Sequence, residues 1–155
     1  DRAKKEWFSL NECIVNVLKL SSVTIGSNIK VLKKFADIPE FYGSRGKITQ
    51  IFTNLVNNSV HAIEEGNPDQ GVIKIITASK GNAVLIEFMD NGIGIESENS
   101  KKVFEPFFTT KDPSKGTGLG LAIVSQIVKQ HKGKIVVRSK LGQGTSFKLA
   151  FPVKK

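Results

Sequence analysis

A stripe of amide side chains is the first feature of this sequence that could do chemistry. Asn54, Asn58 and His61 are spaced at i, i+4 and i+7, so on a helix they lie along one face. Asn is a poor helix former, up to ~0.7 kcal/mol per residue worse than Ala, and a solvated face would more naturally carry Lys and Glu. The amide oxygen of Asn is a suitable neutral ligand for Mg²⁺, an ion often shared with phosphates. The stripe therefore favours a polar ligand or a hydrated cation over a plain polar surface.

The stretch "DNGIGI", residues 90–95, follows a hydrophobic run and has two interpretations. Asp-Asn-Gly is among the commonest turn sequences, because these residues tolerate left-handed backbone angles. The alternative is that the carboxylate of Asp90, at the end of a strand, contacts a ligand. The stretch by itself does not decide between them.

The third feature is the alternation of glycines in "KGTGLGL", residues 115–121. Glycines at the start of a helix let backbone N–H groups approach an anion, which the helix N-terminus also favours. The spacing matches neither the Rossmann pattern nor the P-loop pattern. A flexible junction between a loop and a helix is the alternative.

A cluster of phenylalanines lies in the polar segment "FEPFFTTK", residues 104–111. Phe104, Phe107 and Phe108 could anchor this segment to the core, or could latch a mobile lid that still needs an anchor. A segment as long as 91–117 without regular structure is usually functional or disordered.

Helices and strands that must position these residues follow from hydrophobic periodicity and capping signals. Ser9 begins a helix over 9–20, and Ser44 begins a second that Gly66 ends. Residues 118–131 predict a third helix, with His131 as a C-terminal residue favoured by the helix dipole. The predicted strands cover 28–36, 71–79, 83–90, 134–139 and 145–153, with a possible edge strand within 37–43. This mixture predicts an α/β layer, with the sheet on one side and the helices on the other.

Composition places the chain among globular proteins of one domain. It has 155 residues, 39% of them hydrophobic, and no apolar run approaches the ~20 residues that cross a bilayer. The single cysteine, Cys13, excludes an internal disulfide and fits a reducing compartment. The formal charge of +9 suits a polyanionic partner such as nucleic acid, acidic lipid headgroups or nucleotide phosphates. Because the 23 Lys and Arg are spread along the chain, solvated lysines are an equally good explanation.

Taken in their order along the chain, the four features resemble the catalytic and ATP-binding domain of sensor histidine kinases, in the superfamily that includes gyrase, Hsp90 and MutL. "NLVNNSVHAI" resembles the N box of that family, "DNGIGI" its G1 box, "FEPFFTTK" its F box and "GTGLGL" its G2 box. "GQGTSF", residues 142–147, is similar to the last glycine-threonine motif. The resemblance implies a two-layer α/β sandwich, the Bergerat fold, with a mixed sheet of about five strands on about three helices.

Roles for individual residues follow from the resemblance. It implies that Asn58 binds Mg²⁺, that Asn54 lies one turn earlier towards the same phosphates, and that Asp90 accepts a hydrogen bond from the adenine amino group. Thr145 supports the adenine end, and Gly92 and Gly94 let the backbone pass close to the nucleotide. Asn54 and Asn58 are also the expected catalytic residues. The remaining positions expected to contact ATP are His61, Ile95, Phe104, Thr110, Lys111, Lys115, Gly116, Thr117, Gly118, Leu119, Gly120 and Leu121.

Two positions, His61 and Ser59, differ from common members of the family, and a third, Asn54, distinguishes histidine kinases from the self-contained ATPases of the superfamily. His61 stands where many members carry Lys or Arg, and a neutral imidazole stabilises phosphate less than a fixed cation. Ser59 stands where Ala is usual, a small change that is expected to be tolerated. Asn54 occupies the place of the Glu that acts as general base in the self-contained ATPases, so hydrolysis by this domain is expected to be slow.

The resemblance implies a domain that works with other domains. We expect residues 1–8 to be the tail of a linker from a dimerisation and phosphoacceptor domain, and residues 9–155 to form the catalytic domain. The expected partners are that phosphoacceptor histidine domain and the receiver domain of a response regulator, with no nucleic acid and no membrane insertion. The expected location is the cytoplasmic part of a bacterial sensor kinase. A self-contained Mg-dependent ATPase and a basic nucleic-acid-binding module are the alternatives.

Overall fold

The computed structural model describes residues 4–106, 108 and 119–153. Five strands form one mixed sheet in the order β2-β4-β5-β7-β6, in which β2 and β4 are parallel and the other neighbours antiparallel. The strands of this sheet are β2 (Ile29–Phe35), β4 (Gly71–Lys80), β5 (Ala83–Asp90), β6 (Lys134–Lys140) and β7 (Gly144–Pro152). The helices are α1 (Leu10–Leu20), α2 (Ser22–Ile25), α3 (Arg45–Gly66) and α4 (Gly120–Gln130).

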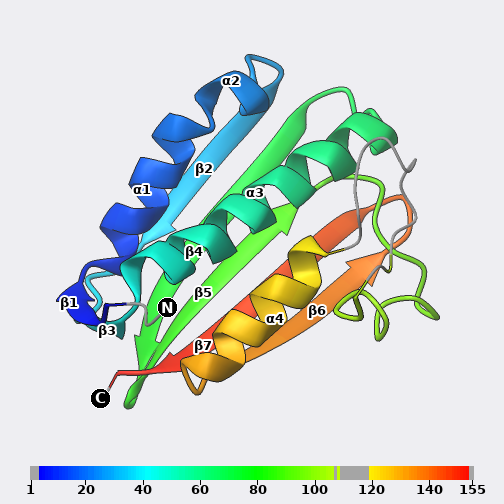
Figure 1. The fold of residues 1–155 in the computed structure, drawn as a ribbon. Coiled ribbons are helices and arrows are strands. Elements are labelled where there is room, and N and C mark those ends of the chain that lie inside the picture. The colour runs from blue at the N-terminus through cyan, green and yellow to red at the C-terminus, as the bar shows by residue number, and fades with distance from the viewer. Residues whose placement is uncertain (1–3, 107, 109–118, 154–155) are drawn as a thin grey trace.

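The helices α1, α3 and α4 cover one face of the sheet, as Figure 1 shows. This arrangement confirms the predicted two-layer sandwich and its mixed five-stranded sheet. The short helix α2 is an addition to the three that periodicity predicts. No helix in the described ranges has both the length and the apolar character that crossing a bilayer requires.

The core lies between α3 and the inner face of the sheet. Alternate residues of β5, among them Ile86 and Phe88, are almost fully buried, as period-2 side-chain alternation requires. From α3, Phe52 stacks on Phe88 with ring centroids 5.7 Å apart. The apolar stripe of α3 that meets the sheet contains Ile48, Ile51, Phe52, Leu55, Val56, Val60 and Ile63.

Both predicted N-terminal caps are present. The hydroxyl of Ser9 accepts a hydrogen bond from the backbone N–H of Glu12 at 3.1 Å, and that of Ser44 accepts one from Lys47 at 3.3 Å. Helix α3 ends at Gly66 as predicted, but the left-handed cap is the next residue, Asn67, with φ of 48°.

A small second sheet was not expected from the sequence. Strand β1 (Glu6–Phe8) pairs antiparallel with β3 (Phe41–Gly43). The edge strand expected within 37–43 therefore exists, but it joins β1 and not the main sheet. Phe8 and Phe41 are both buried and meet edge to face with centroids 5.8 Å apart, so aromatic burial holds this ribbon against the core.

The topology brings distant segments together at one end of the main sheet. Strand β5 ends there at Asp90, and β7 begins there, because Asp90 and Thr145 are paired residues of the two strands. The C-terminal part of α3 and the start of α4 lie at the same end (Figure 1). Residues from the amide stripe, from "DNGIGI" and from residues 142–147 thus share one region of the molecule.

Candidate functional site

Asp90 lies at the end of β5, on the side of the sheet that faces the helices. Its carboxylate Oδ1 accepts a hydrogen bond from the backbone N–H of Gly92 at 2.9 Å. Burial raises the pKa of Asp90, while hydrogen bonds from the backbone of Gly92, the hydroxyl of Ser59 and the backbone of Thr145 act in the opposite direction. The site therefore holds a carboxyl group that has lost much of its water and keeps unused acceptor capacity.

No cation offsets the charge of Asp90 in the part of the chain that the structure describes, where Arg45 and Glu6 form the one ion pair. A buried carboxylate without a charged partner costs free energy unless donors surround it. Ser59 is one such donor, and it is only 1% exposed. Ser59 is therefore more than a tolerated substitution for Ala, because its hydroxyl is a hydrogen-bond partner of Asp90.

Asn91 closes the end of the sheet beside Asp90. Its Oδ1 accepts a hydrogen bond from the backbone N–H of Val72 at 2.7 Å, and its Nδ2 donates to the carbonyl of Gln70 at 2.8 Å. This role of Asn91 was not predicted from the sequence, although Asn commonly pairs with nearby backbone groups where a strand ends. The turn and ligand interpretations of "DNGIGI" are therefore compatible, because Asn91 and the glycines make the turn that fixes Asp90.

The packing and backbone conformation of this turn require glycine at Gly92 and Gly94. A Cβ on Gly92 would lie 2.5 Å from the carbonyl carbon of Ala62, so only glycine lets the loop approach α3 this closely. The backbone N–H of Ile93 then donates to the carbonyl of Ala62 at 2.8 Å. Gly94 has φ of 79°, a left-handed conformation that glycine adopts without strain. These contacts hold the turn against the helix that carries the amide stripe.

Ser139 connects three segments of the site and was not anticipated. Its Oγ accepts a hydrogen bond from the backbone N–H of Ile95 at 2.7 Å and donates to the carbonyl of Gly144 at 2.9 Å. The hydroxyl of Thr145 lies 2.7 Å from the same Oγ. Period-2 alternation in β6 could have found this residue, since it places Ser139 on the inner face after Ile135 and Val137.

The amide stripe of α3 faces the start of α4. Asn54 donates through Nδ2 to the carbonyl of Gly120 at 3.3 Å, which joins the two helices. Asn58 and His61 are half-buried further along the same helix, one and two turns towards Asp90. Leu119 is the residue before α4, and Gly120 and Leu121 are its first two residues, so the predicted helix begins two residues later than 118.

The described part of the phenylalanine segment is anchored to the core. Val103 is buried, and the ring of Phe104 meets that of Phe147 edge to face with centroids 6.2 Å apart. This geometry confirms the anchoring role and leaves the predicted contact of Phe104 with nucleotide untested. The predicted contacts that lie outside the described residues are Thr110, Lys111, Lys115, Gly116, Thr117 and Gly118.

His131 lies away from Asp90, at the other end of α3 and α4. Its Nε2 accepts a hydrogen bond from the backbone N–H of Ser44 at 3.1 Å, and its Nδ1 lies 2.9 Å from the carbonyl of Ile127. Burial lowers the pKa of His131. The residue does terminate α4 as predicted, but the neutral ring fits this position better than the cation that a helix dipole would favour.

Comparison with known proteins agrees with this geometry. The family model described as "Histidine kinase-, DNA gyrase B-, and HSP90-like ATPase" matches residues 43–155. Sensor histidine kinase ZraS of Escherichia coli (strain K12) is 38% identical over 146 residues, which are 93% of this chain and 30% of ZraS. Sporulation kinase E of Bacillus subtilis (strain 168) is 35% identical over 130 residues, 83% of this chain and 17% of the kinase. The chain thus spans less than a third of either relative.

Among solved structures, the nucleotide-free catalytic domain of histidine kinase ThkA superposes with a TM-score of 0.84. It is 32% identical to this chain, and the alignment covers 98% of this chain and 99% of that domain. The motifs, the sandwich and these relatives agree, and the chain belongs to the family of histidine kinase-, DNA gyrase B- and HSP90-like ATPases.

Proposed function

We propose that this chain binds Mg-ATP and donates the γ-phosphoryl group to a histidine on a separate phosphoacceptor domain. The observation that carries the proposal is the half-buried carboxylate of Asp90, which has no cationic partner in the described residues and lies beside the helix that bears Asn58. Such a group suits recognition of a neutral donor, because a neutral donor satisfies its lone pairs without a second charge to desolvate.

The adenine amino group is the donor that we assign to Asp90. Gly92, Ser59 and Thr145 occupy part of the acceptor capacity of the carboxylate and fix its orientation, and about one of its roughly four acceptor sites is left for a further donor. Thr145 lies opposite Asp90 in the strand register, with its hydroxyl held by Ser139. We therefore place the base of the nucleotide at this end of the sheet and its phosphates towards the amide stripe and the start of α4.

The residues present fit a magnesium ion that arrives with the nucleotide. No group of three or more His, Cys, Asp or Glu side chains that could hold a metal is found among the described residues. Mg²⁺ keeps several waters and is commonly bound by one or two protein ligands together with substrate phosphates. Asn58 would supply a neutral amide oxygen, and the bound ion would neutralise phosphate charge.

Phosphoryl transfer in this proposal depends on positioning and charge neutralisation. Asn54 has no carboxylate to accept a proton, and its amide is engaged with Gly120, so the chain lacks a general base at this place for activating water. Of its two histidines, His131 has hydrogen-bonding partners at both ring nitrogens, which excludes it as an accessible nucleophile. His61 lies on the amide stripe itself, so we assign it to the nucleotide side of the reaction.

The partners of the proposed reaction are the phosphoacceptor histidine domain of the same parent protein and, after it, a response regulator receiver domain. The relatives are a sensor histidine kinase and a sporulation kinase, and both are much longer than this chain. A solved structure of histidine kinase ThkA in complex with response regulator protein TrrA is 30% identical to this chain over 97% of its length, with a TM-score of 0.78. We place the parent's catalytic part in the cytoplasm, where ATP and a receiver domain are available.

The direct test is to mix the chain with the separate phosphoacceptor domain of its parent and γ-labelled ATP with Mg²⁺. We expect label on the acceptor that is lost in acid and kept in base, as phosphohistidine requires. The Asn58→Ala variant should transfer little, and the exposed-residue control Asn16→Ala should transfer normally. Absence of transfer to the cognate acceptor would refute the kinase proposal, and steady phosphate release by the chain alone would favour a self-contained ATPase.

A further inference from the structure

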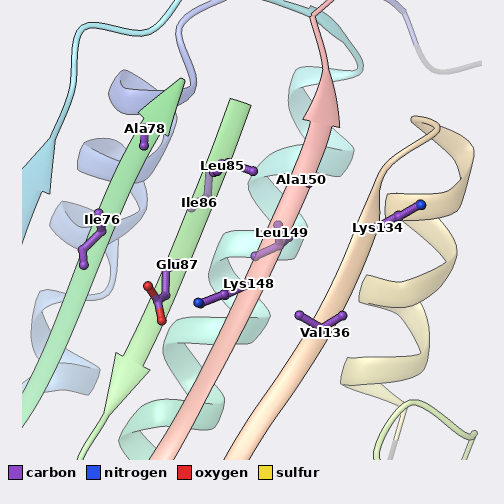
Figure 2. A pocket seen from close by; sticks show the side chains of 10 residues that line it. All are labelled: Ile76, Ala78, Leu85, Ile86, Glu87, Lys134, Val136, Lys148, Leu149 and Ala150. Carbon is purple, nitrogen blue, oxygen red and sulfur yellow. The ribbon is translucent and has the colours of Figure 1, made fainter. Parts of the chain in front are cut away.

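The outer face of the main sheet, which points away from α1, α3 and α4, carries no covering element in the described part of the chain (Figure 1). Side chains of Ile76, Leu85, Glu87, Val136 and Lys148 project from this face, as Figure 2 shows. They surround a shallow hollow of about 280 Å³, lined mostly by apolar side chains. Period-2 alternation and the strand register assign the other outer-face residues.

Basic residues gather on this face from strands that are far apart in the sequence. On one side of the hollow, β2 and β4 contribute Lys30, Lys34, Lys74 and Lys80. On the other side, β6 and β7 contribute Lys134, Arg138, Lys140 and Lys148.

Among the described residues, Glu87 is the one acidic residue on this face. Glu87 lies across the β5–β7 register from Lys148, and its Oε2 accepts a hydrogen bond from Ser146 at 2.6 Å. The eight cations and one carboxylate of this face contrast with the rest of the described chain, where ten Lys and Arg accompany eleven Asp and Glu. The net positive charge of the described residues therefore comes entirely from this face.

None of these cations forms an ion pair with a carboxylate in the described ranges. The one ion pair of the described residues, Arg45 with Glu6, lies elsewhere. At physiological ionic strength the Debye length is ~8 Å, and neighbouring strands are only ~4.8 Å apart, so charges on adjacent strands act on a partner together. A flat anionic partner would meet several of them at once.

The composition of the face distinguishes between anionic partners. Protein interfaces are enriched in aromatic residues and Arg and depleted in Lys, and single-stranded nucleic acid is bound by stacking on aromatic rings. This face has seven Lys, one Arg and, among the described residues, no aromatic side chain. It does have exposed aliphatic residues, with Leu32 39% and Val136 53% exposed. Lysines around aliphatic side chains suit a lipid surface, where ammonium groups meet phosphates and aliphatic groups meet the acyl boundary.

We propose that the outer face of the sheet is a peripheral membrane-binding surface that recognises anionic lipid headgroups. Contact through this face leaves the opposite, helical layer exposed, including Asn58 and the turn that holds Asp90. The domain would lie on the inner leaflet with its candidate nucleotide site directed away from the bilayer. This surface is independent of the proposed kinase activity.

The test uses the chain itself and phosphatidylcholine vesicles with or without phosphatidylglycerol. We expect co-sedimentation that requires phosphatidylglycerol and weakens as salt is raised from about 0.05 M to about 0.5 M, because shorter screening lengths weaken surface electrostatics. A variant with Lys30, Lys134, Arg138 and Lys148 changed to Gln should lose at least ~10-fold in partitioning, since each basic residue contributes about a factor of five near an anionic surface.

The matched control changes Lys19, Lys33, Lys101 and Lys129 to Gln, which removes the same charge from exposed positions off this face. It should partition within about twofold of the unmodified chain if position decides binding and net charge does not. Both variants should keep the melting temperature of the parent; the single variants Lys134→Glu and Lys129→Glu repeat the comparison if either quadruple variant unfolds. Equal losses in both variants would overturn the proposal. Stronger binding to duplex DNA or to polyglutamate than to the vesicles at the same salt would overturn the choice of lipid.

Discussion

The imidazole of His131 accepts a hydrogen bond from the backbone N–H of Ser44, with 3.1 Å between Nε2 and the amide nitrogen. This bond joins the C-cap residue of α4 to the N-cap residue of α3, the helix that carries the amide stripe. The Nδ1 of the same ring donates to the carbonyl of Ile127 at 2.9 Å, which fixes the tautomer with its proton on Nδ1. Protonation of Nε2 would remove the acceptor that Ser44 uses.

Acid should therefore weaken the hydrogen bond between His131 and Ser44 and lower the free energy of unfolding. The variant His131→Ala should lack this part of the pH dependence. Burial is the main cause of the lowered pKa of His131; the Ile127 carbonyl opposes it, and Lys5 and Lys47 reinforce it. A lowered pKa means that the stabilising contribution is present above the unfolded value of 6.5 and is lost as pH falls through the folded pKa. We expect His131→Ala to lower the free energy of unfolding by about 1–3 kcal/mol at pH 8, because a partly buried N–H loses its acceptor.

Urea denaturation at several pH values measures this difference. The gap between the unmodified chain and His131→Ala should narrow as the pH is lowered below 6.5. Lys5 and Lys47 are the charged side chains that act on the ring, and both lower the pKa of His131. A difference in the free energy of unfolding that stays constant as the pH is lowered from 8 to below 6.5 would contradict the assignment of a neutral ring.

Asp90→Asn should separate nucleotide recognition from fold stability. Burial raises the pKa of Asp90 above 3.8, so its contribution to stability is complete below 3.8 and is lost as pH rises through the folded pKa. Replacing the carboxylate by a neutral amide removes that cost, and we expect the ligand-free variant to be at least as stable as the parent at pH 7. The amide keeps one acceptor oxygen and puts an NH2 donor where the carboxylate accepts, so one of the donors around Asp90 loses its acceptor. We expect the adenine amino group to be that donor, so the rise in melting temperature caused by Mg-ATP should disappear.

Thermal melts with and without Mg-ATP, at pH about 4 and about 7, measure both effects, since the stability advantage of the variant should grow with pH. The exposed Asp69 provides the control: Asp69→Asn should leave the nucleotide-dependent rise intact. Retention of the full rise by Asp90→Asn would show that the carboxylate does not read the base.

Asn58→Ala should lower the affinity for Mg-ATP more than the affinity for ATP with the metal chelated. The amide oxygen is the one protein ligand that we assign to the ion, and losing it should weaken Mg-ATP binding by about tenfold, equivalent to about 1.4 kcal/mol. Titration calorimetry with and without a chelator measures both affinities. Asn57→Ala, a change at a half-buried neighbour outside the stripe, should alter neither.

Gly92→Ala should destabilise the fold, because the added methyl group would lie 2.5 Å from the carbonyl carbon of Ala62. Inserting a methyl group into a closely packed contact costs about 1–3 kcal/mol, and here the neighbour is helix backbone, which cannot rotate away. Urea denaturation gives the free energy of unfolding. Gly46→Ala is the matched control, since a Cβ there meets nothing within 4 Å and Ala favours the helix by about 1 kcal/mol. Equal stability of the two variants would show that the turn can move from α3.

Much of the fold could be predicted from local signals. The caps at Ser9 and Ser44, the apolar stripe of α3 and the alternation in β4 and β5 depend on neighbours a few residues apart, and the structure has them where the sequence indicates. Strand β1 could not be predicted in this way. Its three residues are stabilised by pairing with β3, more than 30 positions away, and by the contact of Phe8 with Phe41.

Local sequence specifies which residue types are available: an amide stripe at helical spacing, a carboxylate at the end of a strand, and glycines where backbone must approach closely. The partners of these residues depend on the tertiary structure. It gave Asp90 the hydroxyl of Ser59, brought Ser139 against Ile95 and Thr145, and gathered lysines scattered along the chain onto one face of the sheet. The reason is physical, because hydrogen bonding and burial depend on distances in space, and strand pairing sets those distances between residues that are remote in the chain.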